Sequence, residues 1–183
     1  MHNNITFEFI VVEDFDFNFD FMKIDFPEYE LMDLLHFKKL IFEGNYKGIK
    51  FFYNKNFVAY CFYYITADKK FLWLDYFAVL SEFRNMGIGS KILLFIKENF
   101  NVNGVFLELE IPKFDDDFCK RRIEFYERNN AIKLNIDYNF KTKGNDYISM
   151  FIYYIPFEDL IPDLVDTENI MSECLSKIHS DIF

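Results

Sequence analysis

The residues best suited to chemistry lie at positions 84–90, which read Arg-Asn-Met-Gly-Ile-Gly-Ser. An apolar run that predicts a strand over Phe71–Leu80 precedes them, and a pattern typical of an amphipathic helix follows. Glycine has no Cβ, so main-chain N–H groups beside Gly87 and Gly89 can approach a ligand closely. A helix start adds unpaired N–H donors and a partial positive charge, and Arg84 adds a full charge. This combination predicts an anion site, and a pyrophosphate is its simplest ligand.

Two familiar phosphate-binding motifs do not fit this stretch. A P-loop requires a Gly-Lys-Ser/Thr sequence after a four-residue spacer, and no such lysine is present. The dinucleotide fingerprint requires a third glycine three positions after the second, where this sequence has Ile92. The pattern is therefore Arg-x-x-Gly-x-Gly, between a strand and an apolar helix.

This pattern resembles the signature with which the GCN5-related N-acetyltransferase (GNAT) superfamily binds the pyrophosphate of coenzyme A. A second match lies downstream, where Phe106–Glu110 (FLELE) and Arg121–Asn129 (RRIEFYERN) are similar to the superfamily's strand and its FYER-N helix. Phe26–Glu30 (FPEYE) also resembles the FP-x-x-E segment of one bacterial branch. The resemblance covers about Ile5–Ile155, with specific motifs only in 72–99 and 105–130.

The resemblance implies an acetyl-CoA-dependent N-acetyltransferase in which an amine attacks the acetyl thioester directly, with no metal. A main-chain N–H near Phe77–Val79 would polarise the thioester carbonyl. The residues expected to bind the cofactor are Phe77, Ala78, Val79, Arg84, Asn85, Met86, Gly87, Ile88, Gly89 and Ser90.

Tyr126 matches the superfamily tyrosine that lies near the thiolate sulfur. A phenol with a pKa of about 10 can protonate a thiolate whose conjugate acid has a pKa near 8.5. The resemblance therefore implies that Tyr126 is the general acid. The alternative is a tyrosine that only packs its ring in an aromatic-rich core.

Three carboxylates are candidates for the base that deprotonates the amine. Glu108 aligns with a glutamate that some superfamily members use, and Glu110 shares its face of the predicted strand. Asp75 lies on the preceding strand, where other members place a base or a substrate carboxylate. Deprotonation through water is an equal alternative, and Glu108 or Glu110 could instead pair with one of the arginines at 121 and 122.

The sequence departs from the superfamily pattern at two places. Asn130-Ala131 stands where Gly-Phe is usual, so the preceding helix is expected to end differently. Cys119 stands where many members carry an asparagine that contacts the cofactor, so the resemblance does not extend to that contact. Both departures leave room for a non-catalytic acyl-CoA-binding or protein-interaction module. A further alternative is an unrelated nucleotide-binding α/β protein.

Composition and charge restrict the protein class. The chain has 183 residues, of which 51% are apolar, so one domain with a full core is expected. The net charge of −10 is concentrated at the ends, with −8 over residues 1–33, −6 over 156–183 and +4 between them. An acidic chain argues against nonspecific nucleic-acid binding. The acids near the N-terminus either favour a cationic acceptor or form a solvated face.

Location and partners follow from what the sequence lacks. The three cysteines, at positions 61, 119 and 174, are widely spaced. This spacing argues against a disulfide framework and against a zinc site. No signal peptide is visible, and no apolar run reaches the roughly 18 residues of a membrane span. We expect a cytoplasmic protein, monomeric or homodimeric, whose partners are acetyl-CoA and an amine acceptor, without nucleic acid or membrane.

The predicted fold class is α/β of the α+β type: one GNAT-like domain with a mixed central sheet flanked by helices and a C-terminal helical tail. The domain is predicted over 1–155, with 156–183 as a helical extension packed on it. Strands are expected at 5–12, 49–53, 57–66, 71–80, 105–111, 133–140 and 146–155, the last two joined through 143–145. Helices are expected at about 27–43, from 88, at 118–129 and within 163–182. Residues 14–25 fit an edge strand or an acidic loop.

Overall fold

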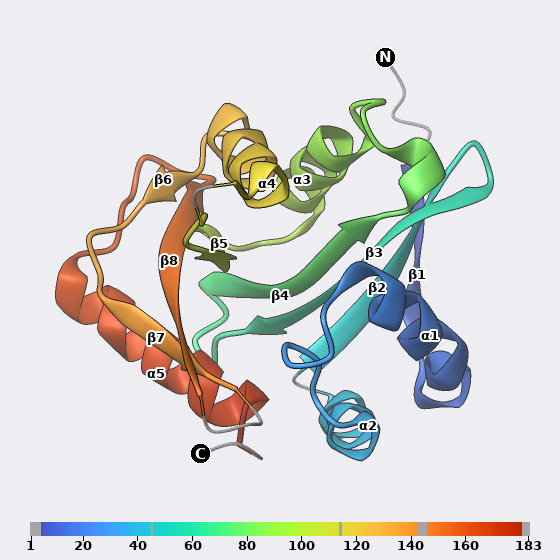
Figure 1. Ribbon diagram of the computed structural model, residues 1–183, viewed down its shortest axis with the longest axis horizontal. Helices are drawn as coiled ribbons and strands as arrows, with labels where there is room; N and C mark the ends of the chain where they lie inside the picture. The colour runs from blue at the N-terminus through green and yellow to red at the C-terminus, as the bar shows by residue number, and fades with distance from the viewer. Residues whose placement is uncertain (1–4, 45, 114, 143–145, 181–183) are drawn as a thin grey trace. The chain divides into compact units, whose positions relative to one another are not determined.

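The computed structural model describes residues 5–44, 46–113, 115–142 and 146–180. The chain forms two compact units, one of Met1–Ile65 with Leu74–Phe100 and one of Thr66–Trp73 with Asn101–Phe183. Strand β4 (Phe71–Val79) belongs to both, with its first residues in the second unit and the rest in the first (Figure 1). No helix among the described residues is long and apolar enough to cross a membrane.

The first unit contains an antiparallel meander and three α-helices. Its elements are β1 (Ile5–Ile10), a 3-10 turn (Val12–Asp14), α1 (Phe15–Asp25), α2 (Leu34–Glu43), β2 (Tyr46–Tyr53), β3 (Asn56–Ile65), the end of β4, a 3-10 turn (Ser81–Phe83) and α3 (Ile88–Asn99). Strand β2 pairs antiparallel with both β1 and β3. Asn54 and Lys55, with φ of 50° and 67°, form the tight β2–β3 turn, and two consecutive positive φ angles match the right-handed twist of a hairpin.

Aromatic side chains fix the helices on both faces of this meander. The ring of Phe95 in α3 contacts Phe51 of β2, with centroids 5.9 Å apart. On the other face, Phe62 of β3 contacts Phe37 of α2 at 5.1 Å and Phe15 of α1 at 5.7 Å. These rings are at most 8% exposed, so the high phenylalanine content of this unit forms an ordinary packed core.

The second unit is built around the long strand β8. Its elements are the start of β4, β5 (Gly104–Glu110), α4 (Asp117–Arg128), β6 (Ile132–Lys133), β7 (Tyr138–Lys141), β8 (Tyr147–Pro156) and α5 (Leu164–Ile178). Residues 71–73 of β4 run parallel to 104–106 of β5, and β8 pairs antiparallel with β5, β6 and β7. The hydrogen-bonded strand order is β1-β2-β3-β4-β5-β8-β6, with β7 also on β8. The predicted α/β fold with a mixed sheet is thus confirmed.

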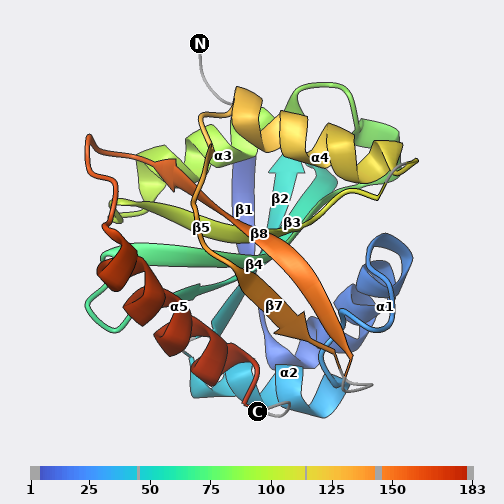
Figure 2. The same ribbon diagram turned by 60° about the vertical axis from the view of Figure 1, so that its left-hand side comes forward.

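Helices α4 and α5 cover opposite faces of β8 (Figure 2). The hydroxyl of Tyr153 in β8 donates to Glu127 of α4 at 3.0 Å. On the other face, Phe140, which pairs with Ile148 of β8, contacts the ring of His179 just after α5 at 5.3 Å. Even- and odd-numbered residues of a strand point to opposite faces, so these contacts place the two helices on opposite sides.

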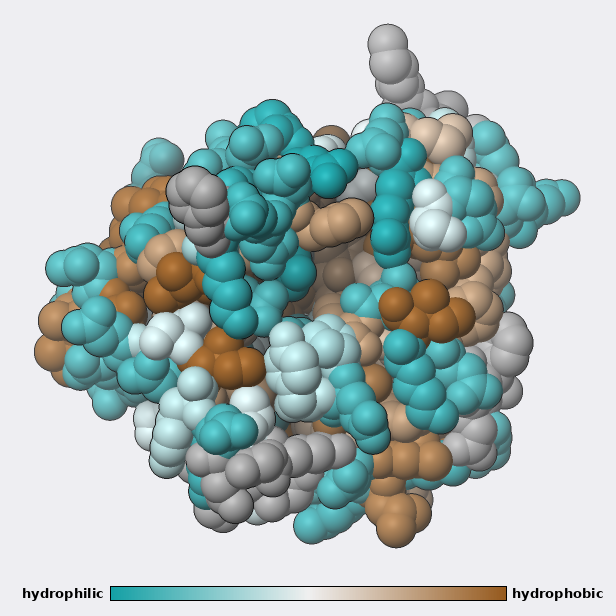
Figure 3. Space-filling model, viewed as in Figure 1, coloured by the Kyte–Doolittle hydropathy of each residue, from teal (hydrophilic) through white to brown (hydrophobic). Residues whose placement is uncertain are grey.

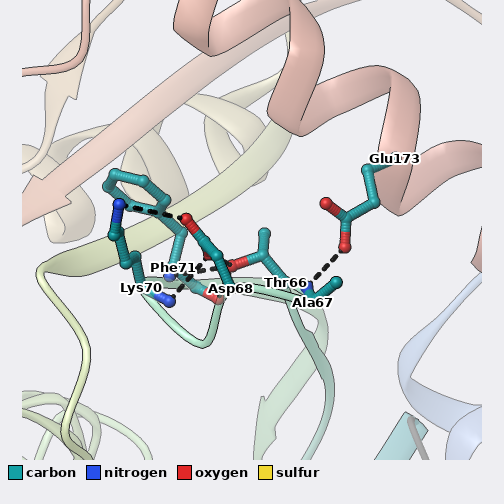
Figure 4. Close-up of polar contacts among 6 residues, drawn as sticks. All are labelled: Thr66, Ala67, Asp68, Lys70, Phe71 and Glu173. Carbon is teal, nitrogen blue, oxygen red and sulfur yellow. Dashed lines mark hydrogen bonds and ion pairs between the residues drawn. The ribbon is translucent and has the colours of Figure 1, made fainter.

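Helix α5 is also tied to the turn that precedes β4. Glu173 accepts a hydrogen bond from the main-chain N–H of Ala67 at 2.7 Å (Figure 4). The turn itself is closed by Asp68, which accepts from the Thr66 hydroxyl at 2.7 Å and from the Lys70 N–H at 3.0 Å. The tail helix therefore packs within the second unit. The division of the chain at residue 155 stays a prediction.

Three sequence-based expectations for single elements are wrong. Residues 15–25 form a helix, neither an edge strand nor a loop, because Phe15, Phe19 and Met22 recur at helical spacing and are buried. The helix expected from Pro27 begins only at Leu34, after Asp33. The strand expected at 133–140 is two short strands, β6 and β7. The link at 143–145 and the last residues of the tail lie outside the described residues.

Candidate active site

Residues 84–90, called here the glycine loop, join the end of β4 to the start of α3. A 3-10 turn at Ser81–Phe83 carries the chain from the strand to Arg84. Asn85 and Gly87 both have left-handed backbone, with φ of 62° and 72°. A Cβ placed on Gly87 would meet nothing within 4 Å, so this side of the loop is open.

Helix α3 begins in this loop without a side-chain cap. Its N-cap is Gly87, and no hydrogen bond from a described side chain closes the first turn. The first N–H groups of an α-helix have no partner within the helix and carry a partial positive charge. Residues 88–90 therefore present donors of the kind that bind a phosphate, while the side chain of Ile88 is buried and anchors the helix start.

The guanidinium of Arg84 is engaged on two sides. Its Nε donates to the carbonyl oxygen of Val79 at 2.8 Å, and its Nη2 donates to Asp25 Oδ1 at 2.6 Å. The Arg84 side chain is 49% exposed, whereas that of Asp25 is 9% exposed. Sequence reasoning anticipated Arg84 as a phosphate ligand and did not anticipate its partner on α1.

Lys91 is a cationic residue that sequence reasoning missed. It follows the glycine loop directly, in the first turn of α3, where the helix dipole disfavours a cation. Its Nζ lies 3.3 Å from the Tyr53 hydroxyl and 4.4 Å from the centroid of that ring. A lysine at a helix start is unfavourable unless an anion binds nearby, so it supports an anion site. Its position just after the glycine loop is visible in the sequence.

Asp75 lies on β4, nine residues before Arg84, and it is bonded to a buried tyrosine. The hydroxyl of Tyr46 donates to Asp75 Oδ2 at 2.5 Å. Burial raises the pKa of Asp75 to about 7, against the opposing effect of this hydrogen bond. Burial, and next the charge of Asp75, raise the pKa of Tyr46 well above its usual value. A raised pKa near neutrality is a property expected of a general base.

The segment between α1 and α2 is fixed to β4 beside Asp75. The hydroxyl of Tyr76 donates to the carbonyl oxygen of Glu30 at 2.6 Å and accepts from the N–H of Met32 at 3.4 Å. The ring of Phe26 contacts Tyr76 with centroids 5.0 Å apart. Residues 26–33 are therefore a fixed turn on this strand.

The other two predicted carboxylates lie on β5 in the second unit. Glu110 is within 3.9 Å of Arg122, so the alternative of an arginine pair holds for Glu110. Glu108 pairs in register with Ile152, and Leu107 pairs with Tyr153. Glu108 therefore points to the face of β5 opposite the side chains of Leu107 and Tyr153.

Tyr126 is buried on α4, seven residues after Cys119, which is also buried. The helix ends in a Schellman motif, in which Asn130 has φ of 66°, its N–H bonds to Glu127 O, and the Ala131 N–H bonds to Tyr126 O at 3.0 Å. Asparagine tolerates the left-handed conformation better than most residues. Asn130 thus takes the place of the expected glycine without disrupting the helix end.

One group of possible metal ligands occurs among the described residues. Side-chain atoms of Glu110, Asp116 and Cys119 lie within 4.8 Å of one another. Two of them have structural contacts: Asp116 caps α4 by accepting from the Cys119 N–H, and the Cys119 thiol donates to the main-chain carbonyl of Glu110 at 2.9 Å. The thiol that replaces the expected asparagine is thus bonded to the end of β5.

The structure divides the predicted site residues between the two units. Asp75, residues 77–79 and the glycine loop form one continuous stretch of the first unit, from β4 into α3. Glu108 and Tyr126 belong to the second unit, one on β5 and one on α4. The surface carries apolar groups (brown) among polar ones (teal) in the view of Figure 3.

Comparison with known proteins gives a family match over much of the chain. The sequence profile described as the acetyltransferase (GNAT) family matches residues 12–130, a range that includes α1, β4, the glycine loop and Tyr126. A search of curated proteins gave no match.

Solved structures share the fold at low sequence identity. A protein from Bacteroides thetaiotaomicron assigned to the GNAT family is 24% identical with a TM-score of 0.78, covering 93% of this chain and 96% of that one. The ribosomal-protein-S18-alanine N-acetyltransferase of Escherichia coli is 15% identical with a TM-score of 0.60, covering 87% and 98%. NAA60 of Arabidopsis thaliana, in complex with acetyl-CoA, is 11% identical with a TM-score of 0.59, covering 82% and 97%.

Proposed function

Because that profile covers well over half of the sequence, the chain belongs to the acetyltransferase (GNAT) family, and we propose that it is an acetyl-CoA-dependent N-acetyltransferase. Its acceptor is an amine of a small molecule or peptide. The observation that carries the proposal is the glycine loop, where left-handed Asn85 and Gly87 lead into the uncapped start of α3. The open space at Gly87 suits a pyrophosphate, which would lie against main-chain N–H groups.

The chemistry needs two proton movements and a polarised carbonyl. In the proposed mechanism, a main-chain N–H at 77–79 donates to the thioester oxygen and stabilises the charge that develops on it. Asp75, whose pKa is raised to about 7 by burial, accepts a proton from the acceptor's ammonium group near neutral pH, and the free amine then attacks the thioester. Glu108 and a water molecule are the other candidates for this base.

Tyr126 is the proposed general acid for the departing thiolate. It lies in the family segment that the sequence resemblance identified, and it is buried on α4. A phenol is a suitable donor because its pKa lies just above that of the thiol it protonates. The competing function is a non-catalytic acyl-CoA-binding module with the same fold. Such a module needs no proton transfer by Asp75 or Tyr126.

The test is a calorimetric titration of ligand-free protein with acetyl-CoA, with ATP and NAD as controls. Binding in the micromolar range, roughly −8 kcal/mol, with no response to the controls is expected. An amine panel assayed by thiol release then separates enzyme from binding module, and it should include polyamines and neutral amines. Binding without release for any amine favours the module, and heat with ATP or NAD alone contradicts the family function.

A further inference from the structure

The carboxylate of Asp25, at the last residue of α1, lies at the centre of a half-buried polar cluster. One oxygen accepts from Arg84 at 2.6 Å, and the other accepts from the hydroxyl of Tyr60 at 2.8 Å. Tyr60 lies on β3 and is 1% exposed, and burial followed by the charge of Asp25 raises its pKa. Asp25 is therefore anchored to the sheet independently of Arg84.

Arg84 connects this anchor to both ends of the segment that leads into α3. Its Nε bond to the Val79 carbonyl holds the end of β4, and the Leu80 N–H beside it bonds to Val58 of β3 at 2.9 Å. Its main chain opens the glycine loop, in which Asn85 and Gly87 are left-handed. One guanidinium thus fixes the strand end relative to the loop, and Asp25 fixes the guanidinium.

We infer that Asp25 is a positioning residue that holds the glycine loop, through Arg84, in the conformation that binds the pyrophosphate. The inference rests on the proposed function for the identity of the ligand. It assigns to the end of α1, almost sixty residues earlier in the chain, a part in cofactor binding. Preorganising a loop improves affinity because less conformational entropy is lost on binding.

The ion pair leaves Arg84 able to contact an anion as well. A guanidinium has five N–H donors, and the two bonds to Val79 and Asp25 engage only two of them. Asp25 itself does not suit recognition of a cationic acceptor, since its side chain is 9% exposed and both oxygens accept bonds within the protein. Asp25 is accordingly excluded from the acidic residues near the N-terminus that could attract a cationic acceptor.

The test compares Asp25→Asn with Asp20→Asn, a matched control on the same helix. Asp20 pairs with Lys23 at 3.1 Å, but its side chain is 74% exposed, so loss of its charge should have little effect. We expect Asp25→Asn to weaken acetyl-CoA binding about tenfold, because the glycine loop must then be ordered on binding. Tyr60→Phe, which removes the anchor and no charge, should weaken it less.

A double-mutant cycle with Arg84→Gln shows whether Asp25 acts through Arg84. If it does, Asp25→Asn adds little to the loss in affinity that Arg84→Gln already causes. The KM for acetyl-CoA should rise, with kcat at saturation and the KM for the acceptor nearly unchanged. General destabilisation would not produce this separation, provided that binding is measured well below the unfolding midpoint.

Amide hydrogen exchange on the ligand-free protein tests the positioning role of Asp25 without acetyl-CoA. Asp25→Asn should speed exchange in the peptide that covers residues 84–90, while Asp20→Asn should not. Unchanged or tighter acetyl-CoA binding by Asp25→Asn, or a full effect in the Arg84→Gln background, overturns the inference. If the wild type fails to bind acetyl-CoA, the proposed function falls, and unchanged loop exchange in Asp25→Asn then overturns the positioning role.

Discussion

The hydroxyl of Tyr46, a residue that is 1% exposed on β2, donates a hydrogen bond to the Asp75 carboxylate on β4 at 2.5 Å. The bond stabilises the charged carboxylate, while burial opposes that charge more strongly and raises the pKa of Asp75 to about 7. A carboxyl group that titrates near neutrality can accept a proton from an ammonium group and release it again. This pair therefore supports the proposal that Asp75 is the base at physiological pH.

The pH dependence of the reaction should follow this pair. If Asp75 is the base, kcat/KM rises with pH and levels off above about pH 7, because only the deprotonated carboxylate accepts a proton. Tyr46→Phe removes the bond that lowers the pKa of Asp75, so the midpoint should move to higher pH. The pH profile of thiol release measures it, with Tyr63→Phe on the neighbouring strand as control. An unchanged midpoint in Tyr46→Phe contradicts the role of Asp75.

Asp75→Asn should stabilise the protein and inactivate it. The folded-state pKa of Asp75 is raised above the unfolded value of about 3.9, so the folded state binds the proton more tightly. Its contribution to stability is full below about pH 4 and is lost as pH rises towards 7. A neutral asparagine avoids this loss, so urea unfolding at pH 8 should show a more stable variant, with little difference at pH 4. Equal stability at both values argues against a buried, titrating Asp75.

Tyr126→Phe should lower kcat by about 100-fold, the lower range for removal of a general acid, and leave acetyl-CoA affinity nearly unchanged. Tyr153→Phe is the matched control. It also removes a tyrosine hydroxyl, but one that donates to Glu127, the residue after Tyr126 on α4. Steady-state kinetics and calorimetry on both variants measure the two effects. Full activity in Tyr126→Phe would leave Tyr126 as a core residue and favour water as the proton donor.

Gly87→Ala should weaken acetyl-CoA binding much more than it destabilises the fold. The φ of 72° strains any residue with a Cβ, at roughly 1 kcal/mol. Gly44→Ala is a close control, because Gly44 has φ of 83°, ends α2 and likewise has open space around its Cβ position. Both variants should lose similar stability in thermal unfolding, and only Gly87→Ala should lose affinity. Equal affinity in both would show that the glycine loop does not bind the cofactor.

Local sequence signals predicted most of the fold because each was reinforced by its neighbours. The Asn54-Lys55 turn, the Gly44 helix end and the Asp116 cap each contain a residue type that favours that local structure. The prediction for residues 15–25 was wrong because phenylalanine and acidic residues alternate there. This period of two concealed the helical spacing of Phe15 and Phe19. Where two periods coexist, burial against the rest of the core decides between them.

The candidate site shows the same division between local and distant information. The glycine loop could be read from residues 84–90 because its binding groups are main-chain N–H donors within one short segment. The partners Asp25–Arg84 and Tyr46–Asp75 could not, since each joins residues about 30 to 60 positions apart that meet only through the sheet. Lys91 is intermediate: its place in the first turn of α3 was visible, whereas its contact with Tyr53 was not.

The hydrogen bond from the Ala67 N–H to Glu173 should contribute to the stability of the fold by holding α5 on the turn at 66–70. Glu173→Gln keeps an amide oxygen that can accept this bond but removes the charge, and Glu173→Ala removes both. We expect Glu173→Ala to cost about 1 kcal/mol, or roughly 2–4 °C in Tm, and Glu173→Gln to cost less.

Glu168→Ala is the control for this prediction, since Glu168 is exposed on the same helix. The turn at 66–70 has its own hydrogen bonds through Asp68, so Glu173 should add to the stability of a turn that is already formed. Loss of Glu173 should therefore speed amide exchange at Ala67 more than at Lys70, because the Lys70 N–H keeps its bond to Asp68. If both variants leave Tm and exchange unchanged, the tail helix is held by its apolar face alone, through residues such as Met171 and Cys174.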